Sequence, residues 1–418
     1  MVAGLERLFR RHRNAQFRPS RSPFEGLYQD ILGDDLVVLK NHGYASTTGG
    51  DITHGFEMPD FSSTDASLCE AALAELRLLK GREPKPAETP VQTLADWLIA
   101  RFGPALGTRL SGFVKKLTGA DADALAAEAA EALGMISRPK LGSDEDMATL
   151  KSSKRFYDDR LGVSLHAGDR RFLGLNIAPR FGYPAREGLR GFCHAAHGRL
   201  EALGVTVRLR CGVEAVGSHA EGVALKTDAG AIDAKTLFWS LPDQPLLGLL
   251  GIDIDLKSAV QPVGAAIHAF EVDAEATLGP DYIHDFDMSR AAFRYSRPGV
   301  YGGQVMANGR SYVLAEVPCH PGDAPSASAP AVSDQIWRDM KDVGFLAPNA
   351  KRHDQLSWAY PVAYTLPKGG WREPVTRAAA AIASNHPRIV AISFGKRGRA
   401  AFMTHYDNDL HSKLTSAA

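Results

Sequence analysis

The chain has 418 residues, of which 44% are hydrophobic and 23% are charged, so it is long enough for two or three domains of an ordinary globular protein. It carries 48 basic and 48 acidic residues, and this balance gives no electrostatic reason to expect nucleic acid as a partner. The four cysteines lack C-x-x-C spacing, which favours reduced thiols in a cytoplasm over disulfides or a zinc site. No long apolar run occurs, so we expect no transmembrane segment.

Residues 1–64 lack the glycine turn with which a dinucleotide-binding unit begins. Such a unit opens with a buried strand, a G-x-G-x-x-G turn and a helix whose N-terminus faces the pyrophosphate. This chain instead opens MVAGLERLFRRHRNAQFRPSRSPFEGLYQ, with neither an apolar strand nor a glycine triplet. Residues 24–40 then predict a helix and a short strand, Leu36 to Leu39, before a loop rich in Gly, Ser and Thr.

Residues 65–170 predict a helical block, which we interpret as an insertion between strands of an α/β core. Leucines recur with helical spacing across residues 65–80. Thr93 or Asp96 could cap the helix that follows. The Ala-rich stretch ADADALAAEAAEAL extends a predicted helix over residues 105–135.

From residue 171 onward the pattern mixes helix and strand. A helix ends at Gly204, and Val205, Val207 and Leu209 alternate as a strand. The segment GVALKTDAGAIDAKTLFWSLP predicts a hairpin and an apolar strand that stops at Pro242. Residues 263–345 predict an antiparallel sheet, and RIVAISF predicts a last strand at 388–394.

Several segments, in a fixed order, resemble the flavin amine oxidase superfamily. Tyr183, Pro184 and Gly188 precede a helix and an LGVTV stretch, as in the family's Tyr-Pro-x-Gly-Gly loop, although Arg186 and Glu187 stand near the second loop glycine. LFWSLPDQP, VGAAIHAFEV, SYVLAEVPCHPGD and AYPVAYTLPKGG resemble later elements of its protoporphyrinogen oxidase-like and UDP-galactopyranose mutase-like branch. IVAISFGKRGRAAFMTHYDNDLHSKL resembles its terminal motif, a strand leading to Gly-Arg, an aromatic pair and an acidic residue.

The resemblance implies an α/β fold with a Rossmann-like FAD/NAD(P)-binding core that is incomplete at the N-terminus. Five parts follow from it: a divergent dinucleotide-binding part (1–64), a helical insertion (65–170), an FAD-binding core segment (171–262), an antiparallel substrate-domain sheet (263–345) and a C-terminal FAD-binding segment (346–418). It further implies a cytoplasmic FAD-dependent oxidoreductase, or a flavin-dependent sugar mutase, that holds FAD without a covalent bond and acts on a small molecule.

The resemblance also names cofactor residues, in two possible registers. In one, Gly395-Lys396 takes the Gly-Arg place, with Gly398 as the second glycine and Asp407 as the acid. In the other, Gly398-Arg399 is that pair and residues 406–409 (Tyr406, Asp407, Asn408, Asp409) match the mutase Tyr-Asp-x-Asp, which keeps the mutase spacing. Glycines let a backbone approach the pyrophosphate, and an arginine supplies charge-assisted contacts to it. Val213 would contact the adenine through its backbone.

Five residues are expected by resemblance to line the substrate cavity: Arg297, Tyr301, Tyr360, Tyr364 and Tyr406. Arg294 and Arg297 could together grip a diphosphate or a carboxylate, and solvated strand arginines are the alternative. We expect no metal site, because His194 and His197 have helical spacing but no visible third ligand.

The front of the chain can be aligned with the family in two ways. In the first, residues 24–50 are an eroded dinucleotide unit, and Lys40 stands where a Glu normally binds ribose hydroxyls. In the second, the first βαβ unit is missing and Leu32-Gly33-Asp34-Asp35-Leu36-Val37 matches a later element; we favour it because that match is closer. A sheet without its first strand would have an open edge for the N-terminal segment, another chain or a second copy to cover. The competing hypothesis is therefore a degenerate non-catalytic homologue, or one subunit of a split enzyme.

Overall fold

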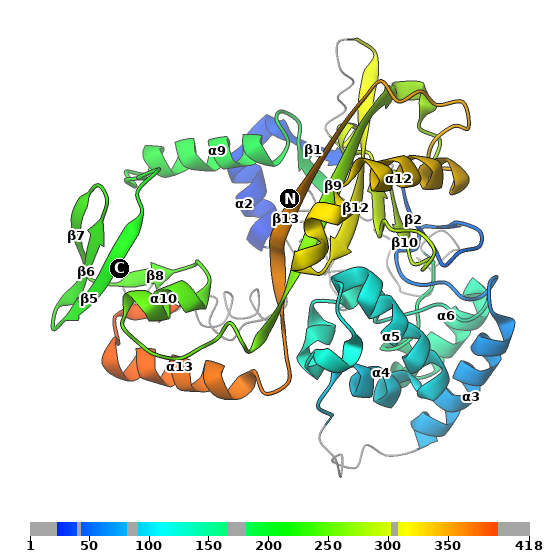
Figure 1. Ribbon diagram of the computed structural model, residues 1–418, viewed down its shortest axis with the longest axis horizontal. Helices are drawn as coiled ribbons and strands as arrows, with labels where there is room; N and C mark the ends of the chain where they lie inside the picture. The colour runs from blue at the N-terminus through cyan, green and yellow to red at the C-terminus, as the bar shows by residue number, and fades with distance from the viewer. Residues whose placement is uncertain (1–22, 40–42, 82–90, 165–180, 302–307, 392–418) are drawn as a thin grey trace.

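The computed structural model describes residues 23–39, 43–81, 91–164, 181–301 and 308–391 (Figure 1). A large sheet, a block of helices and a smaller lobe make up the molecule. Two long strands, β9 (Val260–Asp273) and β13 (Asp354–Pro367), run side by side from the smaller lobe into the large sheet (Figure 1). None of the helices in these ranges is long and apolar enough to cross a membrane.

The large sheet has seven strands in the order β13-β9-β12-β11-β10-β2-β3. Its shorter strands are β2 (Tyr44–Thr47), β3 (Thr53–His54), β10 (Tyr282–Asp285), β11 (Arg294–Ser296) and β12 (Arg310–Cys319). We expected an antiparallel sheet, but it is mixed, because β2 from the N-terminal part pairs parallel with β10. The residue pattern of 263–345 predicts the strands of this segment. It does not predict β2, which lies more than two hundred residues earlier in the sequence.

One face of the large sheet is covered by α11 (Ala324–Ala327) and α12 (Pro330–Asp342). Burial alternates along β9, as expected for a strand with one face in a core. The core beneath α12 contains Phe270, Ile283, Tyr295, Ile336 and Met340, all fully buried. The opposite face of the sheet is therefore the one that is available for a site.

The helical block packs against the end of the sheet near β10. Its helices are α3 (Ala66–Gly81), α4 (Leu94–Phe102), α5 (Pro104–Thr118), α6 (Asp144–Ser153) and α7 (Arg155–Asp158). Thr93 caps α4, and Asp96 completes a capping box with it. The ring of Phe113 lies 5.9 Å from that of Phe61 and 5.4 Å from that of Phe286, which joins the block to the sheet.

The helix predicted over residues 105–135 is wrong in its second half. The helix α5 ends at Gly119, which has the left-handed backbone typical of a C-cap, and the Ala-rich stretch forms short 3-10 turns instead. There, the N–H of Ala126 donates to the Pro367 carbonyl, and the Leu125 carbonyl accepts from the Leu94 N–H. These long-range backbone bonds override the helix propensity of alanine.

The smaller lobe combines a three-stranded meander with a parallel pair of strands. The meander is β5 (Val213–His219), β6 (Gly222–Thr227) and β7 (Gly230–Ala234); β8 (Leu237–Trp239) pairs parallel with β14 (Ile389–Ala391); and α10 (Asp243–Leu249) and α13 (Arg372–Asn385) pack beside them. Residues 205–209, predicted as a strand, form none. Val205 and Leu209 are 45% and 73% exposed, so their alternation has no sheet partner among the described residues.

The N-terminal elements pack with the segment around residue 183. The helix α2 (Pro23–Leu32) contacts α9 (Leu189–Ala202), and β1 (Leu36–Leu39) pairs antiparallel with β4 (Phe181–Pro184). The first alignment needs residues 36–39 in a parallel sheet, so this pairing does not fit it. Lys40 lies outside the described residues.

Candidate functional site

A row of side chains crosses the large sheet on the face opposite α12. The registers of the six strands place Trp358, Ile267, Glu316, Arg294, His284 and Ser46 directly beside one another, in that order. The position of His268, which follows Ile267 on β9, shows on which face of the sheet this row lies. The Nδ1 atom of His268 is 2.7 Å from the hydroxyl of Ser333 on α12, so His268 points toward α12. Successive residues of a strand point to opposite faces, so Ile267 and its row point away from α12.

One half of this face is buried. Ser46 donates a 2.7 Å hydrogen bond to the Met58 carbonyl, and Nδ1 of His284 lies 2.9 Å from the Glu57 carbonyl, so the segment around residue 57 covers β2 and β10. The His284 ring also stacks on that of Phe293 at 4.8 Å. These contacts occupy the polar groups of this half and give it a structural role.

The other half of the face, over β12, β9 and β13, is open. Ile267, Glu316 and Trp358 are half-buried, and on the edge strand β13 Leu356 and Tyr360 are 64% and 47% exposed. We call the five residues Leu356, Trp358, Tyr360, Ile267 and Leu314 the open strip. Large apolar side chains gathered on one exposed strand are typical of a binding surface.

A bulge in β13 marks the end of the open strip nearest the smaller lobe. The pairing with β9 shifts between Tyr360 and Tyr364. The hydroxyl of Tyr364 donates a 2.9 Å hydrogen bond to the Leu117 carbonyl at the end of α5, although the side chain stays 40% exposed. The structure thus places both tyrosines at one end of the open strip, and their contact with a ligand remains a prediction.

The two arginines that could grip an anion are instead bound to carboxylates. Arg294, whose side chain is 8% exposed, hydrogen-bonds Glu316 through Nε at 3.0 Å and more closely through a second guanidinium nitrogen. Arg297 donates to Asp281 at 2.8 Å and to Thr277 at 3.0 Å. A diphosphate grip by this pair would have to displace these carboxylates, and it stays a prediction. The alternative of solvated arginines does not fit the buried side chain of Arg294.

Tyr301 and Val213 take part in packing contacts. The Tyr301 ring is 1% exposed and 5.5 Å from the ring of Tyr183, so it packs the end of β11 against β4. Val213 begins β5 opposite Thr227 and packs on the core of the smaller lobe. The remaining predicted residues, Gly395, Gly398, Arg399, Tyr406, Asp407, Asn408 and Asp409, lie outside the described residues.

The loop before α9 retains a glycine-like backbone where the sequence has a glutamate. Gly188 has φ of +55°, and a Cβ there would lie 2.7 Å from the Tyr183 hydroxyl, so only glycine fits. Glu187 also has φ of +55°, a conformation that costs a non-glycine residue about 1–2 kcal/mol. Arg186 is bound to Asp35 at 2.9 Å. The loop thus keeps the backbone of a two-glycine turn with one glycine.

A second polar cluster joins the helical block to the sheet. Asp285, fully buried at the end of β10, accepts from Arg290 at 2.6 Å and lies 3.6 Å from the ammonium of Lys116. Burial lowers the pKa of Lys116 despite the nearby carboxylate. Because all three groups are paired with one another, we assign this cluster a structural role.

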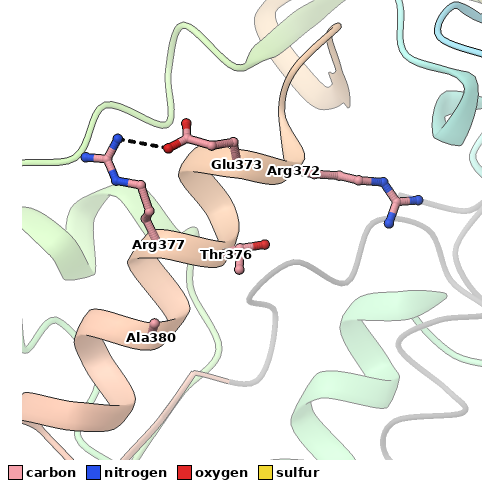
Figure 2. A pocket seen from close by; sticks show the side chains of 5 residues that line it. All are labelled: Arg372, Glu373, Thr376, Arg377 and Ala380. Carbon is pink, nitrogen blue, oxygen red and sulfur yellow. Dashed lines mark hydrogen bonds and ion pairs between the residues drawn. The ribbon is translucent and has the colours of Figure 1, made fainter. Parts of the chain in front are cut away.

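Two further candidates hold no ligand site. The hollow beside α13 in Figure 2 is lined by Arg372, Glu373 and Arg377, whose side chains point to opposite sides of the helix; Arg377 pairs with Glu373 at 3.0 Å. His194 lies on α9 at 3.1 Å from Glu187, and no group of three metal-ligating residues occurs within the described ranges.

Sequence reasoning missed Glu316, Ile267 and Trp358. Each stands at an alternate position of an evident strand, which is the available local signal. Only the registers of β12, β9 and β13 bring the three together.

The comparisons with known proteins agree on the fold. No family model matches the sequence, and no curated protein matches it. A reduced UDP-galactopyranose mutase is 13% identical, with a TM-score of 0.65 over 94% of this chain and 82% of its own. A protoporphyrinogen oxidase-like protein from Exiguobacterium sp. is 16% identical (TM-score 0.55; 88% and 79% covered), and a putrescine oxidase bound to putrescine is 14% identical (0.54; 95% and 87%). The likeness predicted from the sequence, to the fold of flavin amine oxidase superfamily enzymes, is confirmed.

Proposed function

We propose that this chain is an FAD-dependent oxidoreductase of the amine oxidase, protoporphyrinogen oxidase or UDP-galactopyranose mutase type, acting on a small molecule. The observation that carries the proposal is the fold match to the mutase over 94% of the chain. The open strip supports it, because long strands that lead from the smaller lobe to an exposed aromatic surface suit a planar ring and a substrate lying together.

The parallel pair of the smaller lobe supports the expected cofactor residues. In parallel sheets, ligands bind beyond the carboxyl ends of the strands. In the sequence, the segment from Gly395 to Asp409 follows β14 (Ile389–Ala391) on its carboxyl side. We propose that Gly395, Gly398 and Arg399 hold the pyrophosphate there, that Asp407, Asn408 and Asp409 contact the flavin, and that Val213 meets the adenine. The described residues contain no phosphate cradle of their own.

Side chains of this chain would also line the proposed substrate cavity. Bound FAD would accept or return a hydride. Tyr360 and Tyr364, with Tyr406, would form the wall that orients the ring and excludes water. Arg297 and Tyr301 would act only by positioning, because Arg297 is bound to Asp281 and Tyr301 is buried on Tyr183.

The test is the visible absorption spectrum of the purified protein, before and after addition of FAD. Flavin bands that stay with the protein through gel filtration would support the proposal, and a protein that takes up no FAD would sink it. Lys396→Ala and Arg399→Ala then form a matched pair. Loss of a charged phosphate contact should weaken FAD binding about tenfold, and the variant that shows this loss identifies the register.

A specific observation favours a second candidate, a degenerate homologue or a split enzyme. Among the described residues, β8 and β14 form a sheet of two strands, and β1 pairs with β4 instead of joining them. Within the described ranges no third strand joins this parallel pair, and parallel sheets are normally larger and buried. For this candidate, a protein partner or a second copy would complete the sheet. FAD uptake by the isolated chain would rule out the need for it.

A further inference from the structure

The ion pairs of the large sheet select a class of ligand. We infer that the open strip takes an aromatic or apolar ligand without phosphate groups, and that Glu316 determines this specificity by excluding phosphate. The inference shares the site of the proposed function and adds a ligand class to it.

The charges on this face disfavour a phosphate ligand. On this face and beside it, the arginines of the described strands each have a carboxylate: Arg294 has Glu316, Arg297 has Asp281, and Arg310 has Glu271 at 3.0 Å. A phosphate brought to the strip would meet the Glu316 carboxylate, whose side chain is 27% exposed and directly beside Ile267, before any unpaired guanidinium of the described strands. The phosphate and the Glu316 carboxylate would repel each other. Without a free cation to pair with, the phosphate would also lose hydration free energy that no new contact offsets.

The open strip itself offers an apolar, partly aromatic surface. Directly across the sheet, Ile267 separates Glu316 from Trp358, and Tyr360 and Leu356 flank Trp358 on the same face of β13. Cross-strand neighbours of this kind lie about 5 Å apart, so their side chains form one continuous surface. Covering exposed aromatic and aliphatic groups is favourable, and ring faces prefer a planar partner.

The test measures binding by calorimetry on the full chain with three probes: naphthol, uridine diphosphate and inorganic pyrophosphate. The wild type should bind naphthol, and neither phosphate should compete with it. Trp358→Ala should weaken naphthol binding about tenfold, because the ring face of the strip is lost. Glu316→Gln should raise the affinity with which pyrophosphate competes for the strip about tenfold, since it removes the carboxylate that would repel it, and should leave naphthol binding within about threefold.

Glu271→Gln is the matched control. Glu271 lies on β9, on the same face of the sheet as Glu316, and is the partner of Arg310. The substitution makes the same charge change and should leave pyrophosphate binding at the strip unchanged. Phosphate bound without displacing naphthol lies at another site, whereas displacement of naphthol from the wild type by pyrophosphate or uridine diphosphate would overturn the inference. So would a failure to bind naphthol, or naphthol binding that Trp358→Ala does not weaken. If Glu316→Gln does not fold, the wild type and Trp358→Ala still decide. None of these readouts uses flavin, so a protein without FAD would sink the proposed function and leave this result standing.

Discussion

The helical block and the helix α9 differ in how completely they cover their apolar side chains. In the block, Leu94, Leu98 and Leu106 are fully buried. By contrast, α9 buries none of its residues, and Leu203 just beyond it is 63% exposed. The block therefore has a core of its own, whereas α9, which follows the loop at Gly188, lies on the surface. Ligand-binding segments generally come from the less stable parts of a protein.

The largest expected effect separates these two regions directly. Phe113→Ala removes a ring that is 1% exposed and packed between Phe61 and Phe286, so it should lower the free energy of unfolding by about 3–5 kcal/mol. Leu200→Ala on α9, where the side chain is 41% exposed, should change it by less than about 0.5 kcal/mol. Urea denaturation measures both, and equal losses would show that the contrast in burial does not govern stability.

A smaller effect concerns pH and the sheet face under α12. His268 is fully buried, with Nε2 2.9 Å from the Ala327 carbonyl and Nδ1 near Ser333 and Ser357. Burial lowers the pKa of His268 below its ordinary 6.5. As the pH falls below that value, the unfolded chain takes up the proton first. The stabilising contribution is therefore complete above the unfolded pKa and is lost on acidification.

We expect this histidine to lower the free energy of unfolding by at most about 1 kcal/mol for each pH unit of acidification between about pH 6.5 and 5. His268→Gln should flatten the fall in unfolding free energy over that range, measured by urea denaturation at each pH. His194→Gln, whose ring is exposed on α9, is the control and should keep the slope. A slope that survives His268→Gln would assign the acid sensitivity to other groups.

The smallest effect tests the loop before α9. Glu187→Gly should stabilise the protein by up to about 1 kcal/mol, because glycine adopts φ of +55° without strain. Glu187→Ala removes the same carboxylate but keeps the strain, so it should bring no gain. Thermal unfolding of both variants measures the difference. A gain from alanine as large as that from glycine would attribute the effect to the carboxylate and its neighbours.

Several features of the fold could be predicted from residue types a few positions apart. The capping box at Thr93 and Asp96, the hairpin of β6 and β7, and the alternation along β9 each depend on local chemistry. The likeness of the fold to flavin amine oxidase superfamily enzymes followed from the order of such segments, and the solved structures confirm it.

The tertiary structure decided what depends on register and on distant partners. It turned the Ala-rich stretch after Gly119 into short turns, left Val205 and Leu209 without a strand partner, and paired β1 with β4. It also bound Arg294 to Glu316 and Arg297 to Asp281, so each of the two arginines considered for anion binding has a carboxylate partner. The physical reason is the range of the interaction: capping and periodicity act within one or two turns of chain, whereas strand neighbours and ion-pair partners are chosen only when distant segments pack.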